Sequence, residues 1–230
     1  MIDVDRKSES APHSLGQGKY GAIDVRQALC RVFLGKCYLC ETPVDVGTFS
    51  IDHHKPKNES PELECAWENL FPTCNTHRCN ERRSRSWPHG GLLDPARGDG
   101  VETRLFQAFE GLPSRVLASA QCNSKIHFEA VEAEDAAARN TAIELDRIHN
   151  GTGSSDNAQL TAIALQRAIS MRVLEVAERV RKLDTARLEA SAEIAQARLE
   201  LQILFSRRAP YTMLVRSVFA HRPDLRALFD

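Results

Sequence analysis

The chain has 230 residues and a formal net charge of −1, with 42% hydrophobic and 27% charged residues, which is ordinary for a globular protein of one large or two small domains. No apolar run approaches the ~20 residues of a membrane-spanning helix, and residues 1–23 lack the apolar core of a signal peptide, so we expect a cytoplasmic protein. The near-neutral charge excludes an overall basic footprint, so any surface for nucleic acid must be local.

The first half of the chain predicts a mixture of short helices, strands and loops. Residues 1–23 are expected to form a flexible tail, and residues 24–34 a helix that ends near a glycine. Residues 48–52 read as a strand, which is followed by a polar loop that contains proline. Residues 68–86 begin irregularly and then become helical, and residues 121–131 contain a further strand.

From residue 135 the pattern changes to helices, with a linker near residues 150–157 and a segment free of Gly and Pro from 158 to 207. One apolar stripe of this segment consists of Leu165, Ile169, Val173, Val176, Val180 and Leu183. It is continued by Leu188, Ala192, Ala195 and Leu199. A second face carries Leu160, Ile163, Met171 and Leu174. Two apolar faces indicate packing on both sides, either in a plain helical hairpin or against a partner.

The cysteines indicate a metal site. Seven is an odd number, and clustered cysteines in a reducing compartment are more often metal ligands than disulfides. Two pairs, Cys37 with Cys40 and Cys74 with Cys79, suit a structural zinc ion. The second pair is wider than usual, so His77 remains an alternative ligand. The other three cysteines (Cys30, Cys65 and Cys122) are expected to be core or incidental residues.

Polar residues with the chemistry of an active site lie between and beside these pairs. The strings "IDHHKP", "ENLFPTC" and "CNERR", together with the first cysteine pair, resemble the HNH endonuclease family over residues 37–85. The resemblance implies a ββα-metal core in which His53 is the general base, Asp52 and Asn80 bind a catalytic Mg²⁺ or Mn²⁺ ion, and Asn69 holds the active-site loop. His54 is either a supporting residue or a surface histidine.

Basic residues around this motif are candidates for contacts with nucleic-acid phosphates, although an arginine-rich helix face is often only solvated. They are Lys55, Lys57, Arg78, Arg82, Arg83 and Arg85.

A wider match, which includes "GGLLDPARGDGVETRLFQ", resembles the PtuB nuclease subunits of the bacterial Septu anti-phage systems and their retron-associated relatives. That resemblance implies a partner, a PtuA-like ATPase of the ABC/SMC class. The chain has no GxxxxGK[ST] nucleotide-binding motif, so control by ATP would have to come from another chain.

The sequence therefore predicts an α+β fold: a flexible tail (1–23), an HNH nuclease domain with a zinc knuckle (24–134) and a mostly α-helical half (135–230) that docks the partner. The expected activity is metal-dependent hydrolysis of phosphodiester bonds, most simply in DNA. Alternatives are an RNA-cleaving enzyme of the same family, and a zinc-knuckle module that binds nucleic acid or protein without catalysis. A restriction or homing nuclease would need a sequence-reading domain, and no helix-turn-helix or basic arm is evident.

Overall fold

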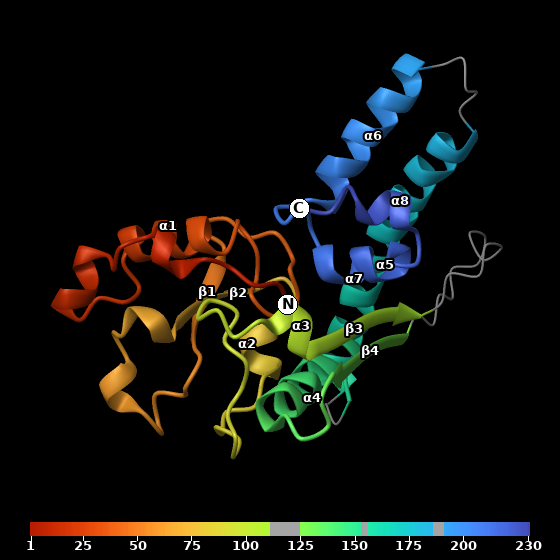
Figure 1. Ribbon diagram of the computed structural model, residues 1–230. Coiled ribbons are helices and arrows are strands. Elements are labelled where there is room, and N and C mark those ends of the chain that lie inside the picture. Colours follow the sequence, from red (N-terminus) through yellow and green to blue (C-terminus); the bar gives the residue numbers. More distant parts are fainter. Residues whose placement is uncertain (111–124, 153–155, 186–190) are drawn as a thin grey trace.

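A computed structural model describes residues 1–110, 125–152, 156–185 and 191–230. The helices are α1 (Ile23–Val32), α2 (Cys79–Arg82), α3 (Val101–Arg104), α4 (Ala136–Asn150), α5 (Asp156–Thr185), α6 (Ser191–Phe205), α7 (Thr212–Phe219) and α8 (Pro223–Arg226). The strands are β1 (Phe49–His53), β2 (Leu70–Cys74), β3 (Leu105–Glu110) and β4 (Lys125–Ala130). The predicted mixture of helices and small sheets is thus confirmed (Figure 1).

The β1–β2 pair is the framework of the N-terminal part. The two strands are antiparallel, with Asp52 opposite Phe71 and His53 opposite Leu70. All five residues of β2 are buried, which is why this strand shows no alternation of polar and apolar residues in the sequence. α1 packs against β2 through the i, i+3, i+4, i+7 spacing of Val25, Ala28, Leu29 and Val32.

The second sheet joins the two halves of the chain. β3 and β4 form an antiparallel pair, α4 packs on β4, and α7 from the C-terminal part packs on β3. One hydrophobic cluster of the described residues extends from the N-terminal segment to α8. The boundary predicted at residues 134 and 135 therefore does not coincide with a break in the packing.

The N-terminal segment differs from the flexible tail that its polar sequence predicted. Arg6 is buried and donates from Nη2 to the Leu70 carbonyl at 2.9 Å, while its guanidinium lies 4.7 Å from the ring centre of Phe71. Ile2 and Leu15 are also buried. A few anchoring side chains hold this segment, and such isolated contacts leave no periodic pattern in a sequence.

α5 and α6 form a helical hairpin that projects from the rest of the molecule (Figure 1). The first predicted stripe is buried from Leu165 to Val180, as expected of a helix that packs on α4, α6 and α7. Its predicted continuation is wrong, because α5 ends at Thr185 and α6 begins a new register in which Leu201, Leu204 and Phe205 are buried. Leu188 lies outside the described residues.

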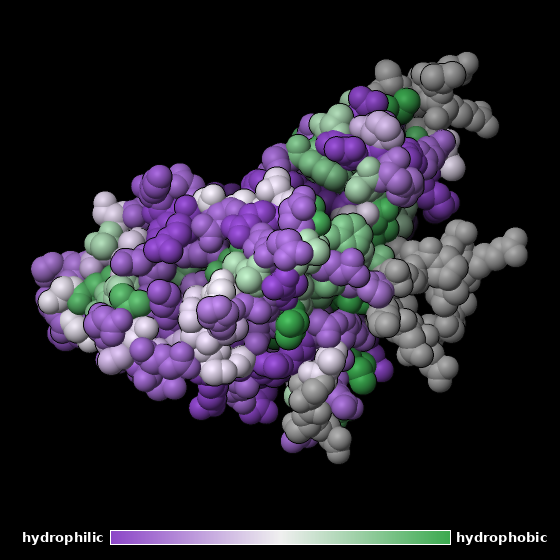
Figure 2. All heavy atoms as spheres, turned by 60° about the horizontal axis from the view of Figure 1, so that its bottom comes forward, coloured by the Kyte–Doolittle hydropathy of each residue, from purple (hydrophilic) through white to green (hydrophobic). Residues whose placement is uncertain are grey.

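The surface is mainly hydrophilic in the view of Figure 2, with scattered hydrophobic side chains. The second predicted apolar face is exposed at Leu160, Ile163 and Met171 on α5, and α6 adds Leu199 and Ile203. None of the helices in the described ranges combines the length and hydrophobicity that crossing a bilayer requires.

Candidate metal centre and catalytic cleft

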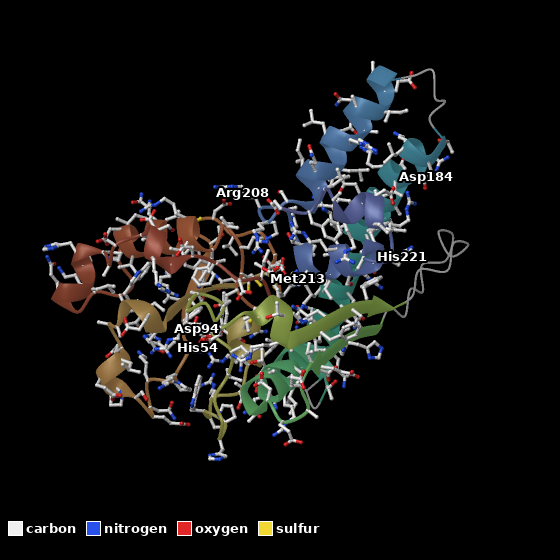
Figure 3. All side chains as sticks on the ribbon, viewed as in Figure 1. His54, Asp94, Asp184, Arg208, Met213 and His221 are labelled. Atoms are coloured by element: carbon white, nitrogen blue, oxygen red, sulfur yellow. The ribbon has the colours of Figure 1, made fainter. Side chains whose placement is uncertain are left out.

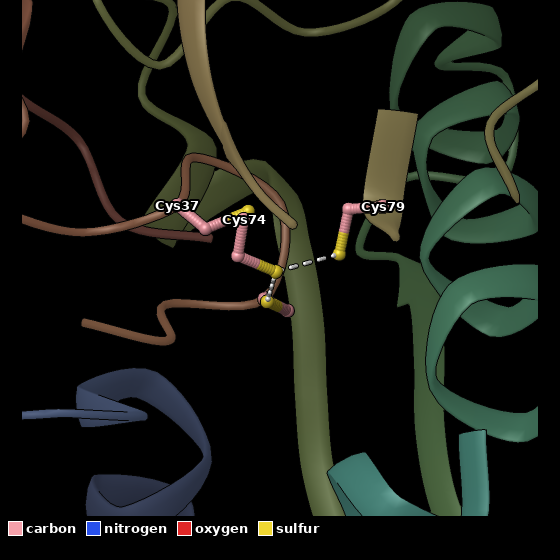
Figure 4. A group of neighbouring side chains, drawn as sticks. Cys37, Cys74 and Cys79 are labelled. Carbon is pink, nitrogen blue, oxygen red and sulfur yellow. Dashed lines mark hydrogen bonds between the residues drawn. The ribbon is translucent and has the colours of Figure 1, made fainter. Parts of the chain in front are cut away.

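Four cysteines meet in the interior, as the paired spacing predicted. The Sγ atoms of Cys37, Cys40, Cys74 and Cys79 all lie within 4.8 Å of one another, and the Cys74 sulfur lies 3.5 Å from those of Cys40 and Cys79 (Figure 4). All four residues are buried. Cys30 and Cys65 are half-buried and outside this group, and Cys122 lies outside the described residues.

The local backbone explains how the four sulfurs converge. The loop between Cys37 and Cys40 is closed by a bond from the Glu41 amide to the Cys37 carbonyl, and it is joined to β2 by a bond from the Tyr38 amide to the Pro72 carbonyl. Cys74 ends β2 and Cys79 begins α2. Between them Arg78 adopts a left-handed conformation (φ 49°), so the chain reverses within four residues.

The buried thiols of the cluster change one another's pKa values. Hydrogen bonds from the neighbouring thiols lower the pKa of the Cys74 thiol, whereas burial raises the pKa of Cys40. Four sulfurs at these distances could therefore hold a tetrahedral Zn²⁺ ion, which deprotonates its thiol ligands. His77 is buried beside Cys74, but its ring does not join the four-sulfur group, so the geometry favours the four-cysteine set over the His77 alternative.

Arg82 lies next to this cluster and not at the surface. It is 7% exposed, donates from Nη2 to the Arg147 carbonyl of α4 at 3.0 Å, and has no hydrogen-bond partner at Nε or Nη1 within the described chain. Negative charge on Cys79 and Cys40 opposes the lowering of its pKa by burial. A divalent ion with four thiolates carries two net negative charges, and Arg82 is placed to offset one of them.

A cleft of about 660 Å³ lies beside the metal centre, between the end of β1 and the start of α2. It brings together six of the residues that the sequence singled out, namely Asp52, His53, Lys57, Asn80, Arg83 and Arg85. Asn80 follows Cys79 directly and is exposed in the first turn of α2. Figure 3 labels His54, the residue that directly follows β1.

His53 is held in one orientation by two neighbours. Its Nε2 lies 2.9 Å from the Glu64 carbonyl, and its ring packs edge-on against Tyr20 at 4.9 Å. A carbonyl only accepts, so Nε2 carries the proton and Nδ1 keeps its lone pair. Burial lowers the pKa of His53, which favours the neutral imidazole at neutral pH. The side chain is thus prepared to accept a proton at Nδ1.

Asn69 fastens the loop between β1 and β2. Its Oδ1 accepts from the Lys55 amide at 2.7 Å, and its Nδ2 donates to the carbonyls of Lys55 (3.1 Å) and Leu63 (3.2 Å). Because Glu64 belongs to the same loop, Asn69 also fixes the carbonyl that orients His53. His54 is not the surface histidine of one alternative, since it is buried between Phe71 and Trp87.

The predicted basic residues separate into two groups. Exposed positions are Lys55, Lys57, Arg78 and Arg85. Arg82 and Arg83 differ from the prediction of phosphate contacts, because both side chains are buried and Arg83 forms an ion pair with Asp52. Tyr38, which donates to Asp52 at 2.6 Å, was missed by sequence reasoning. Its position between two cysteines gave no signal, because the contact arises only when β1 pairs with β2.

Comparison with known proteins supports the resemblance to PtuB. The chain is 29% identical to the Septu protein PtuB of Bacillus thuringiensis over 90 residues, which is 38% of this chain and 33% of that protein. The match thus spans about a third of the length of this curated relative. No family model matches the chain, and no solved structure matches it.

Proposed function

We propose that the protein is an HNH endonuclease that hydrolyses phosphodiester bonds of nucleic acid, most simply DNA, with a divalent metal ion. The observation that carries the proposal is the meeting of Asp52, His53 and Asn80 in one cleft, directly beside a four-cysteine centre. The order β1, β2, α2, with its cysteines at the end of β2 and the start of α2, agrees with the ββα arrangement that the resemblance implied.

In this reaction His53 takes a proton from water through Nδ1, and the water oxygen forms a bond to phosphorus. The bond from phosphorus to the leaving sugar oxygen breaks, and that oxygen takes up a proton from a second water molecule. The Glu64 carbonyl keeps Nε2 protonated and turned away from the reaction, which fixes the direction of proton transfer. The neutral state favoured by burial makes His53 competent as a base at neutral pH.

Two oxygen donors in the cleft suit a hard divalent cation. The carboxylate of Asp52 and the side-chain oxygen of Asn80 would hold Mg²⁺ or Mn²⁺, with water completing the coordination. Such an ion, when bound, offsets the charge that develops on the phosphate and on the leaving oxygen. The sulfur donors of the four-cysteine centre suit Zn²⁺ instead, so the two sites are expected to hold different metals.

Exposed cations near the cleft supply a local path for the phosphate backbone. Lys57 and Arg85 line the cleft, and Lys55 and Arg78 lie exposed nearby in the sequence. Lys57 and Arg78 are paired with Glu64 and Glu81, so phosphate would compete with these surface ion pairs, which are weak. An RNA substrate would use the same cations.

We further propose that the protein is the nuclease effector of an anti-phage defence system controlled by a PtuA-like ATPase. Support comes from the likeness to a Septu protein PtuB and from the lack of a nucleotide-binding motif in this chain. The helical half offers a docking surface, because Leu160, Ile163 and Met171 on α5 are exposed in a row at helical spacing.

The nuclease proposal is tested by cleavage of plasmid DNA and of RNA with Mg²⁺ or Mn²⁺, using the protein alone and co-purified with the ATPase. His53→Ala should lower the rate by ~10²–10⁴. Because His53 packs on Tyr20, the variant is compared well below its melting temperature. His89→Ala, at an exposed position away from the cleft, is the matched control. Binding of nucleic acid without cleavage, unchanged in His53→Ala, would favour the non-catalytic module.

The docking proposal is tested by point substitutions and not by truncation, because α7 packs on β3 and its removal would expose the core. Met171→Glu should weaken capture of the ATPase, whereas Glu132→Lys, at an exposed position between β4 and α4 and away from α5, should not. Equal capture by both variants would place the docking surface elsewhere.

A further inference from the structure

One buried guanidinium holds the end of β1. Arg83 donates from Nη1 to the Asp52 carboxylate, to the Tyr38 hydroxyl (3.1 Å) and to the His53 carbonyl (3.0 Å), and from Nη2 to the His54 carbonyl. The Arg83 and Asp52 side chains are only 4% and 9% exposed. The guanidinium thus joins the carboxylate to the backbone of the two residues that follow it.

The two oxygens of the Asp52 carboxylate have different surroundings. Oδ2 accepts from the Tyr38 hydroxyl at 2.6 Å and from Arg83, whereas Oδ1 makes no hydrogen bond to the described residues. Asp52 lines the cleft. A carboxylate with one oxygen fixed by two donors has little freedom to rotate, so the direction of the other oxygen is also fixed.

We propose that Arg83 and Tyr38 are positioning residues that hold Oδ2 of Asp52 and thereby present Oδ1 to a hard divalent cation in the cleft. The assignment rests on the proposed function, which gives that cation to Asp52.

Arg83 could act in two ways: as a clamp, which holds Asp52 in place while the cation binds, or as a latch, which occupies Asp52 and blocks the cation. The contacts favour the clamp. When Asp52 binds a metal ion, Arg83 would remain anchored by Tyr38 and by the carbonyls of His53 and His54, because the ion replaces none of these partners. A buried ion pair also adds little net stability, since desolvation offsets the attraction of the charges. Holding a precise geometry is therefore the stronger physical role for this pair.

The test measures Mn²⁺ binding to the full, zinc-loaded chain without nucleic acid, by calorimetry and by electron paramagnetic resonance. Tyr38→Phe removes one hydroxyl and keeps the ring, so the fold should be retained. We expect its Kd for Mn²⁺ to rise about tenfold or more, as for other residues that support a metal ligand, with unchanged zinc content. Arg83→Lys should bind Mn²⁺ more weakly than wild type and more tightly than Arg83→Met.

Tyr211→Phe is the matched control, because Tyr211 is also a buried tyrosine but its hydroxyl contacts Thr42 and not Asp52. Its Kd for Mn²⁺ should equal that of wild type. Arg216→Met controls for the loss of a buried arginine far from the cleft, where Arg216 bonds the Phe205 carbonyl.

The outcomes separate this proposal from the proposed function. If Asp52→Asn weakens Mn²⁺ binding but Tyr38→Phe does not, Arg83 and Tyr38 do not position the ligand. Tighter binding by Arg83→Met would show a latch and would also overturn the proposal. If wild type binds no Mn²⁺, or Asp52→Asn binds it equally well, the catalytic cation site itself is wrong and the clamp has no function.

Discussion

Replacing Asn69 with alanine should loosen the loop that orients the proposed general base. Asn69 is 4% exposed, and its side chain makes three hydrogen bonds, two with the backbone of Lys55 and one with the Leu63 carbonyl. At roughly 1 kcal/mol for each bond, the loss amounts to about 3 kcal/mol. For a chain of this size that corresponds to a fall in Tm of roughly 6–12 °C if the loop unfolds with the rest of the molecule.

The cleavage rate of Asn69→Ala should fall together with its Tm, because the same loop carries the Glu64 carbonyl that accepts a hydrogen bond from Nε2 of His53. Calorimetry gives the change in Tm, and native-state hydrogen exchange reports opening of the loop, residues 54–69. Asn58→Ala is the matched control for Tm and hydrogen exchange, since Asn58 is an exposed asparagine of the same loop. Asn69→Asp keeps the acceptor for the Lys55 amide but turns a second acceptor oxygen toward the carbonyls of Lys55 and Leu63, so it should cost at least the two hydrogen bonds that it loses.

Two results would refute this reasoning. The hydrogen-bond assignment is wrong if Asn69→Ala has the Tm and the amide exchange of wild type. The link to catalysis is wrong if the loop exchanges faster in Asn69→Ala but the cleavage rate, measured well below Tm, stays unchanged.

Three further predictions concern metal and pH. Purified protein should contain about one tightly held zinc ion. Cys74→Ser should release this ion and destabilise the N-terminal part, since structural zinc sites contribute ~10 kcal/mol or more to folding. An intact fold without zinc would contradict this prediction. Arg82→Met should raise the Kd for zinc about tenfold in chelator competition, whereas Arg85→Met, at an exposed position, should leave it unchanged. Burial lowers the pKa of His149 to about 3, so the unfolded chain takes up a proton near pH 6.5 before the folded one does. The free energy of unfolding should therefore fall as pH drops below 6.5, by up to ~1.4 kcal/mol per pH unit from this residue, and denaturant titrations of His149→Gln should show a correspondingly smaller slope.

The sequence predicted those parts of the molecule that depend on spacing along the chain. Helix α1, strand β1 and the burial of Leu165 to Val180 follow local periodicity, and the structure has them as expected. The four cysteines were also recognised, because a metal site with two pairs of ligands imposes a short spacing within each pair. Each of these features depends on the spacing of residues that are close together in the sequence.

The features that were missed depend on contacts between distant segments. Arg6 is an isolated charged residue in a polar segment, and only the fold shows that its guanidinium lies on Phe71. Tyr38 donates to Asp52 from 14 residues away, across the contact between the cysteine loop and β2. The apolar stripe was continued past Thr185, into the sequence of α6, because no Gly or Pro separates the two helices in the sequence.

The burial of Arg82 and Arg83 has one common cause, which is the shortness of α2. Successive residues of an α-helix point about 100° apart, and α2 has only four residues between the β1–β2 pair and α4. Cys79 therefore faces the other cysteines and Asn80 faces the cleft, while Arg82 reaches the Arg147 carbonyl on α4. Arg83, next in the chain, reaches Asp52. Because α2 has neighbours on several sides, it does not present a row of arginines to solvent. Since Cys79, Asn80 and Arg83 lie within five consecutive residues, a zinc ion that fixes Cys79 would also fix the positions of Asn80 and Arg83. The metal centre would then act on the cleft through covalent geometry alone, without forming part of its wall.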